Sequence, residues 1–164
     1  MKELLIRAER CLGCRSCELA CAVAHSTSQN LLASLTEEPR PQYRVHVAGD
    51  GRRALPLQCR NCEDAPCLSA CLTGALRRDA RGVVVCSSDL CIGCWMCIMV
   101  CPFGIITQSH HQRRIVKCDR CPDREIPACV TACPTRALRY REVDRETAEK
   151  RREVLDNLKI PTSR

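Results

Sequence analysis

Short runs of apolar or alternating residues recur along this chain, and each is bounded by turn residues or by cysteines. Such runs predict short strands, here at residues 3–7, 43–47, 83–86, 114–117 and 137–141. Short helical segments are predicted at residues 15–25, 66–72, 95–100 and 127–133. The order of strand, cysteine loop and helical turn repeats along the chain, and this repetition indicates internal duplication.

Two segments interrupt the repeat. Residues 26–53 are polar and hold two prolines and two glycines, so they predict an excursion between the first two repeats. Residues 144–158 predict a charged helix capped by Asp144. Its narrow apolar stripe consists of Val154, Leu155 and Leu158. Two interpretations of this helix stay open: it docks lightly on its own domain, or it clasps a partner subunit.

Cysteine is unusually frequent, at 17 of 164 residues. In a short secreted protein this frequency would indicate disulfides, and in a cytosolic protein it indicates metal or redox chemistry. Only three consecutive apolar residues precede Arg7, which is far short of a secretory signal, and no later stretch resembles a membrane span. We therefore expect a soluble, cytoplasmic protein without a membrane span, and the odd cysteine count argues against a closed disulfide framework.

Sixteen of the cysteines form four quartets. They are Cys11, Cys14, Cys17 and Cys21; Cys59, Cys62, Cys67 and Cys71; Cys91, Cys94, Cys97 and Cys101; and Cys118, Cys121, Cys129 and Cys133. Quartets one and three read C-x2-C-x2-C-x3-C, and Pro102 follows the third. This run is typical of bacterial two-cluster ferredoxins, in which the fourth cysteine ligates the other cluster. We therefore predict four [4Fe-4S] clusters and sixteen cysteine iron ligands, with each quartet giving three ligands to one cluster and one to its partner.

Zinc is the main alternative, because two Cys-x2-Cys pairs can form a tetrahedral four-thiolate site. A zinc ribbon has no use for the third and fourth cysteines that recur in all four quartets. The remaining candidates receive structural interpretations. Cys86 follows three valines and is interpreted as a buried strand thiol, Trp95 as a shield of its cluster from water, and the four histidines as surface or capping residues: His25, His46, His110 and His111.

Composition limits both the core and the partners. Only four aromatic residues are present, so four clusters would have to fill much of the interior, and we expect the chain to be largely unfolded without them. The polypeptide has a formal net charge of +7. Sixteen thiolates and four oxidised cluster cores would bring the total to about −1. Nucleic-acid binding is not expected, because the arginines are dispersed and aromatic stacking platforms are almost absent.

The four quartets, in this order, resemble the polyferredoxin-type electron-transfer subunits that carry four [4Fe-4S] clusters, and the resemblance covers residues 3–141. Residues 11–26, CLGCRSCELACAVAHS, and residues 37–41, EEPRP, look especially similar to the small iron–sulfur subunit of carbon monoxide dehydrogenase systems. Similar small subunits accompany tungsten-dependent aldehyde oxidoreductases, hydrogenases and formate dehydrogenases. Arg136 stands where the family often has glycine, which puts in question whether that turn keeps a positive φ angle.

The resemblance implies an α+β fold of two nested bacterial-ferredoxin-like modules, with short strands and helices wrapped around four cubane clusters. Residues 1–52 and 112–142 would form the outer module, residues 53–111 the inserted module, and residues 143–164 a C-terminal helix and tail. The implied ligand sets are Cys11, Cys14, Cys17 with Cys133; Cys118, Cys121, Cys129 with Cys21; Cys59, Cys62, Cys67 with Cys101; and Cys91, Cys94, Cys97 with Cys71. Spacing alone supports only the pairing of quartets two and three, and the outer pairing depends on the resemblance.

The sequence contains no glycine-rich phosphate loop, no flavin or nicotinamide fingerprint and no nucleophile–base pattern. We therefore expect no enzymatic activity from this chain alone. The expected function is relay of single electrons between a catalytic oxidoreductase subunit, of carbon monoxide dehydrogenase or tungsten aldehyde oxidoreductase type, and a second redox protein. Alternatives are a freely diffusing polyferredoxin or the corresponding subunit of a hydrogenase or formate dehydrogenase. An acidic docking face would favour the diffusing protein, and an apolar patch the fixed subunit.

Overall fold

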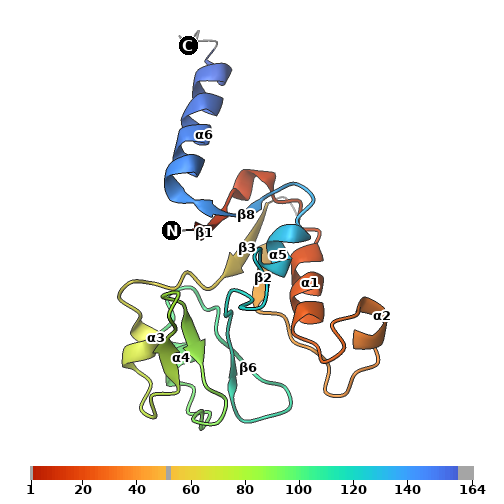
Figure 1. Ribbon diagram of the computed structural model, residues 1–164, viewed down its shortest axis with the longest axis vertical. Coiled ribbons are helices and arrows are strands. Elements are labelled where there is room, and N and C mark those ends of the chain that lie inside the picture. Colours follow the sequence, from red (N-terminus) through yellow and green to blue (C-terminus); the bar gives the residue numbers. More distant parts are fainter. Residues whose placement is uncertain (1, 51–52, 159–164) are drawn as a thin grey trace.

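The computed structural model describes residues 2–50 and 53–158, a small mixed arrangement of short strands and helices (Figure 1). The strands are β1 (Lys2–Ile6), β2 (Val45–Gly49), β3 (Ala54–Gln58), β4 (Leu76–Arg78), β5 (Val84–Cys86), β6 (Thr107–Gln108), β7 (Ile115–Val116) and β8 (Leu138–Glu142). The helices are the 3-10 turn η1 (Ala8–Arg10) and α1 (Ser16–Ala24), α2 (Leu31–Ser34), α3 (Pro66–Ser69), α4 (Met96–Met99), α5 (Ala128–Thr131) and α6 (Val143–Asn157).

The strands pair into four two-stranded antiparallel sheets within the described residues. Three are hairpins between neighbours, β2 with β3, β4 with β5 and β6 with β7. The fourth joins the two ends of the cysteine-rich region, because β1 pairs with β8 in a register that places Leu4 opposite Tyr140. The expected module boundary between residues 52 and 53 falls between the paired strands β2 and β3.

The sequence pattern predicted both strands of the β1–β8 pair. In each of the three hairpins it predicted one strand and missed the other, namely β3, β4 and β6. These three strands carry weak patterns: β3 contains Pro56, β4 has two arginines after Leu76, and β6 is only two residues long. These strands form because they pair with a neighbouring strand, and not because their own residues favour an extended backbone. The strand expected at residues 43–47 begins two residues later, at Val45. The excursion at residues 26–53 contains α2, whose first turn is capped by the Asn30 side chain.

Apolar burial is divided between two separate groups. One joins Ala65, Leu76, Val84 and Ile105 to neighbouring residues of the middle of the chain. The other joins residues of both ends of the cysteine-rich region: Leu4, Cys17, Cys21, Val45, Cys129 and Leu138. Cysteines belong to both groups, as expected where aromatic side chains are scarce. Figure 1 shows the corresponding division, with α3 and α4 in one region and α1, α5 and β2 in another.

Helix α6 projects away from the rest of the molecule (Figure 1). The prediction that Asp144 caps it is wrong, because the helix begins at Val143 with Glu142 at the cap position and no side-chain capping bond. Strand β8 continues to Glu142, which pairs with Lys2, so the helix begins directly after the strand. Val154 and Leu158 on the apolar stripe are 51% and 63% exposed. The stripe therefore does not attach α6 to the body.

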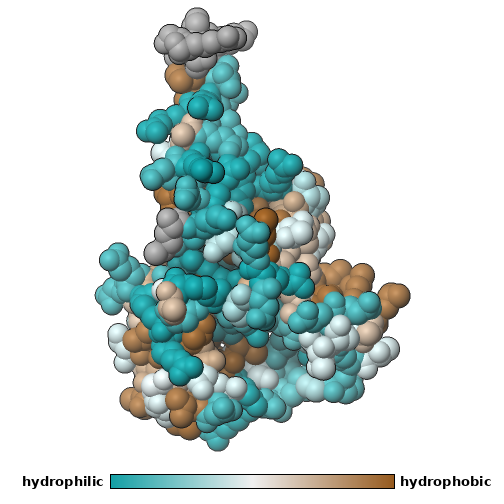
Figure 2. Space-filling model, in the orientation of Figure 1, coloured by the Kyte–Doolittle hydropathy of each residue, from teal (hydrophilic) through white to brown (hydrophobic). Residues whose placement is uncertain are grey.

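Among the described residues, no helix combines the length and apolar character needed to cross a membrane. Hydrophobic surface nevertheless occurs on the molecule. Figure 2 shows it over α2 and over the region that carries α3 and α4, whereas α6 is largely hydrophilic. The exposed apolar side chains on α2 and immediately after it are Leu31, Leu32 and Leu35. Those on or near the α3–α4 region include Leu72, Ile92, Met96, Met99 and Phe103.

Candidate iron–sulfur sites

The four cysteine loops share one backbone feature: the residue before the second cysteine has a positive φ angle. These residues are Gly13 (69°), Asn61 (47°), Gly93 (63°) and Arg120 (59°). A left-handed residue at this point turns the chain sharply, and such turns can direct successive N–H groups to one side. Two of the four are not glycine, although this conformation is strained for other residues. The shared conformation indicates that all four loops are shaped for the same task.

A second repeated turn follows quartets two, three and four. Gly74, Gly104 and Arg136 each lie three residues after a fourth cysteine and have φ angles of 65°, 58° and 55°. Each donates its backbone N–H to the carbonyl oxygen of that cysteine at 3.2 Å. The turn at Arg136 therefore keeps its positive φ without glycine. After quartet one the equivalent residue, Ala24, still belongs to α1.

Backbone N–H groups also reach the cysteine sulfurs at repeated positions. Leu76 donates to Cys71 Sγ at 3.4 Å, and Leu138 donates to Cys133 Sγ at 3.5 Å, each from five residues beyond the cysteine. Arg44, from the segment before β2, donates its N–H to Cys21 Sγ at 3.2 Å. Such N–H contacts stabilise negative charge on sulfur, which is what a cluster-ligating thiolate requires.

Two small cavities lie in the middle of the chain, and each is lined by cysteines from both quartets two and three. Cys59, Cys62, Cys67 and Cys101 line the first cavity. Cys71, Cys91, Cys94 and Cys97 line the second, together with Cys86. Trp95 forms part of the wall of the second cavity, where it was expected to exclude water.

The outer quartets are brought together by α1 and α5, which lie side by side in Figure 1. Cys129 on α5 lies close enough to Cys118, Cys121 and Cys21 to interact electrostatically. Cys17 on α1 lies similarly close to Cys133. Burial raises the pKa of Cys21 to about 12 and that of Cys17 to about 11. As free thiols these groups would be protonated, and a metal would have to displace the protons.

The donor set fits [4Fe-4S] clusters. All 17 cysteines are free thiols and none forms a disulfide. At each of the two middle cavities the structure gathers three thiols of one quartet with one thiol of the other, the arrangement that two-cluster ferredoxins use. Backbone N–H groups donate to the sulfurs of Cys21, Cys71 and Cys133.

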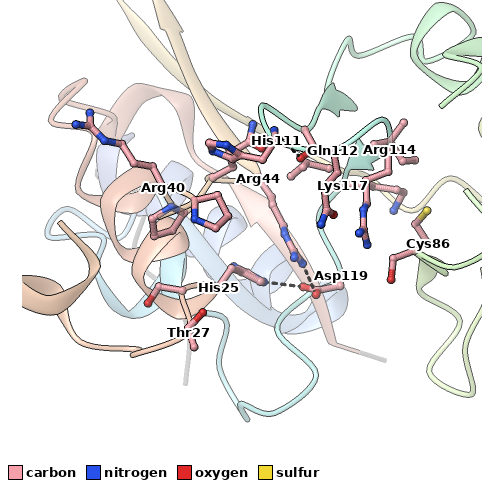
Figure 3. A pocket seen from close by; sticks show the side chains of 18 of the residues that line it. His25, Thr27, Arg40, Arg44, Cys86, His111, Gln112, Arg114, Lys117 and Asp119 are labelled. Atoms are coloured by element: carbon pink, nitrogen blue, oxygen red, sulfur yellow. Dashed lines mark hydrogen bonds and ion pairs between the residues drawn. The ribbon is translucent and has the colours of Figure 1, made fainter. Parts of the chain in front are cut away.

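Sequence reasoning missed a polar network beside quartet four (Figure 3). His25 forms the C-cap of α1, as a capping histidine was expected to do, with Nδ1 at 2.7 Å from the carbonyl oxygen of Cys21. Its Nε2 lies 3.1 Å from Oδ1 of Asp119, which also pairs with Arg44 and accepts the N–H of Cys121 at 3.0 Å. Burial opposes ionisation of Asp119, but His25 and Arg44 hold its pKa well below the usual range. His25, Asp119 and Cys121 could together approach one metal ion, but Cys121 already belongs to quartet four.

Cys86 was expected to be a buried strand thiol. It ends β5 as expected, but it is only half-buried and lies in the wall of the second cavity. Burial and the neighbouring Cys91 raise its pKa to about 12, so it remains a neutral thiol. It also borders a larger cavity of about 580 Å³, whose lining includes Arg40, Arg44 and Arg114 (Figure 3). The sequence offered no signal for this placement beyond proximity to Cys91.

Comparison with known proteins identifies the family. The model of the 4Fe-4S dicluster domain matches residues 52–143, which include quartets two to four. The chain is 45% identical to an iron–sulfur protein of Rhodospirillum rubrum, over 83% of this chain and 80% of the relative. It is 39% identical to the electron transport protein HydN of Escherichia coli K12, over 91% and 94%. It is 33% identical to PhsB, the thiosulfate reductase electron transfer subunit of Salmonella typhi, over 83% and 73%. The chain therefore belongs to the 4Fe-4S dicluster domain family of ferredoxin-type iron–sulfur proteins.

Proposed function

We propose that this chain is an electron-transfer subunit that holds four [4Fe-4S] clusters and relays single electrons between a catalytic oxidoreductase subunit and a second redox protein. Relatives across most of its length are named electron transport proteins or electron transfer subunits. These names support an electron-transport role and a chain that is not catalytic on its own. When bound, the clusters supply one-electron redox chemistry, and the protein holds them and shields them from water.

The proposed ligand sets are those implied by the sequence resemblance. Set A is Cys91, Cys94, Cys97 and Cys71; set B is Cys59, Cys62, Cys67 and Cys101; set C is Cys118, Cys121, Cys129 and Cys21; set D is Cys11, Cys14, Cys17 and Cys133. The two cysteine-lined cavities support sets A and B. Cys129 interacts electrostatically with Cys118, Cys121 and Cys21, which supports set C, and also with Cys17 of set D. The interaction of Cys17 with Cys133 supports set D.

The observation that carries the proposal is the order in which these sets lie. Cys97 of set A is in electrostatic contact with Cys67 of set B. Cys118 of set C is similarly close to Cys59 of set B, and Cys129 of set C to Cys17 of set D. These neighbours support a row of the proposed sets in the order A–B–C–D. A row suits relay between two partners, because each internal site has a neighbour on both sides.

Both ends of the row reach the surface. Cys14 in set D and Cys94 in set A are the exposed cysteines of the chain, and all the others are at least half-buried. Next to these loops, Leu12 is 74% exposed and Ile92 is 57% exposed. Apolar side chains at both ends favour a fixed subunit with two protein contacts over a freely diffusing polyferredoxin.

The module organisation is part of the proposal. Residues 53–111 would form the inserted module with sets A and B, and residues 1–52 and 112–142 the outer module with sets C and D. The C-terminal helix would lie outside both modules, and residues 159–164 of the expected tail at 143–164 lie outside the described part of the chain. The two apolar groups support this division only in part, because Ile115 of the outer module belongs to the middle group. Strand pairs cross both boundaries, β2 with β3 and β6 with β7.

The class of catalytic partner rests on the sequence resemblance. We propose carbon monoxide dehydrogenase or tungsten aldehyde oxidoreductase first, with hydrogenase and formate dehydrogenase as alternatives. PhsB is named as a thiosulfate reductase subunit, so thiosulfate reductase is a further class of partner to test. We place the complex in the cytoplasm, because sixteen ligating thiols require a reducing compartment.

Deletion of this subunit from its native cell tests the proposal. The catalytic partner, identified by co-elution with the untagged protein, should still reduce an artificial dye but should no longer deliver electrons to its physiological acceptor. Complementation with the intact chain should restore delivery. Physiological transfer that survives the deletion would contradict the relay function, and transfer restored by free addition of purified protein at low concentration would favour the diffusing alternative.

A further inference from the structure

Lys117 is a buried cation between the two halves of the cysteine row. It lies between β7 and Cys118, and only 6% of its surface is exposed. Its Nζ donates to the backbone carbonyl of Val84 in β5 and, at 3.1 Å, to that of Cys118. The ammonium therefore ties a strand of the proposed inserted module to the first cysteine of quartet four.

Within residues 2–50 and 53–158, no carboxylate lies within ion-pair distance of Lys117. The charged residues that follow it are already paired: Asp119 with Arg44 and His25, and Arg120 with Glu3. A buried ammonium that has only carbonyl partners is costly unless negative charge lies near it. An anionic group close to Lys117 would therefore stabilise the buried ammonium.

Thiolates of two ligand sets can meet that need. Lys117 Nζ lies 3.1 Å from the backbone carbonyl oxygen of Cys118 in set C, and its other partner, Val84, lines the cavity of set B. These two sets are also the ones that meet across the module boundary, through Cys59 and Cys118. One positive charge thus lies between the two middle members of the row.

We propose that Lys117 is an electrostatic positioning residue that raises the reduction potentials of the clusters in sets B and C above those of the end sets. Each reduction adds one negative charge, and a nearby cation in a low-dielectric interior stabilises the more negative state. The electron then rests in the middle of the row, at the module boundary, and leaves from either end. This inference rests on the proposed four-cluster function.

Redox titration followed by EPR tests the inference on anaerobically reconstituted full-length protein. In the wild type, two of the four components should be reduced at higher potential than the other two. In Lys117→Met these two should become harder to reduce by at least about tenfold in equilibrium constant, or ~59 mV for one electron. Lys117→Arg should restore the wild-type pattern. Lys150→Met, which removes one charge from exposed α6, should shift nothing.

Iron and sulfide contents are measured first, so that the two proposals fail separately. A wild type that assembles fewer than four clusters overturns the proposed function. A wild type with four clusters overturns this inference if all four potentials coincide, or if Lys117→Met leaves them unchanged or shifts all equally. The inference is also overturned if Lys117→Met shifts the reduction potentials of the clusters in sets A and D instead. The EPR signals of these two clusters are identified by their loss in Cys94→Ala and Cys14→Ala. If Lys117→Met assembles poorly, Lys117→Gln removes the charge but keeps an N–H donor, and the wild-type titration stands independently.

Discussion

The Arg7 guanidinium, almost completely buried beneath α6, donates from Nε to the carboxylate of Glu146. Arg7 also pairs with Glu153, and Arg139 pairs with Glu146 and Glu149. Helix α6 is therefore attached through charge to Arg7, directly after β1, and to Arg139 in β8, while Val154 and Leu158 of its apolar stripe stay exposed. This attachment agrees with a helix docked lightly on its own domain, and the exposed stripe leaves a surface for a partner.

Removal of Glu146 should loosen α6. Glu146→Ala leaves Arg7 buried with fewer partners, so we expect a loss of about 1–3 kcal/mol in unfolding free energy. Glu142→Ala is the matched control, because its pair with Arg145 is exposed, and such pairs contribute about 0–1 kcal/mol. Hydrogen exchange of the α6 amides and thermal unfolding measure the difference. Equal effects of the two substitutions would show that the buried network does not hold the helix.

The same network gives a pH dependence. A hydrogen bond from Arg139, opposed by burial and supported by a hydrogen bond from Arg141, lowers the pKa of Glu149 from 4.5 to about 2. A depressed folded-state pKa contributes stability above the unfolded value, and that contribution is lost as pH falls from about 4.5 towards 2. The effect should be modest, because Glu149 is partly exposed. The destabilisation caused by Glu149→Gln should be constant from pH 8 to about 5 and shrink below about 4.5. A difference that grows on acidification would have the wrong sign.

The backbone of Arg136 is strained. Among the described residues, the Arg136 side chain forms no hydrogen bond that would compensate for this strain. Its φ is 55° and its side chain is exposed. Arg136→Gly should therefore raise the unfolding free energy by about 1 kcal/mol, and Arg136→Val should lower it. Gly74→Val, in the equivalent turn after quartet two, is the control and should destabilise in the same direction as Arg136→Val. Thermal unfolding of holo-protein is the measurement, and a less stable Arg136→Gly would refute the strain argument.

Substitutions of Cys14 and Cys86 distinguish a cysteine that ligates a cluster from one that only lies near a cluster site. Cys14→Ala should remove one cluster, so that iron and sulfide fall by about a quarter. Cys86→Ala should retain the full content, although Cys86 lines the same cavity as set A. Metal analysis and visible absorption measure both variants. Loss of a cluster in Cys86→Ala with full content in Cys14→Ala would reverse the proposed assignment.

The sequence predicted what depends on local spacing and missed what depends on tertiary pairing. The cysteine loops and their helical turns lie where the pattern placed them, because ligand spacing and loop shape are encoded within a dozen residues. Strands β3 and β4 have weak patterns and form through their hairpin partners. Lys117 and Asp119 lie beside ligands in the sequence, but their roles depend on Val84, His25 and Arg44, which come from distant segments. Asp144 was predicted to cap α6 but lies two residues after the true cap residue, Glu142, because β8 continues to Glu142.

The central claim is that all four quartets hold [4Fe-4S] clusters. Anaerobic determination of iron and acid-labile sulfide per chain, with zinc measured on the same sample, tests it most directly. The account predicts about sixteen iron and sixteen sulfide per chain, four of each in every cluster, and negligible zinc. About four zinc and no acid-labile sulfide would contradict it, and about eight of each would restrict the clusters to a single ferredoxin-like module.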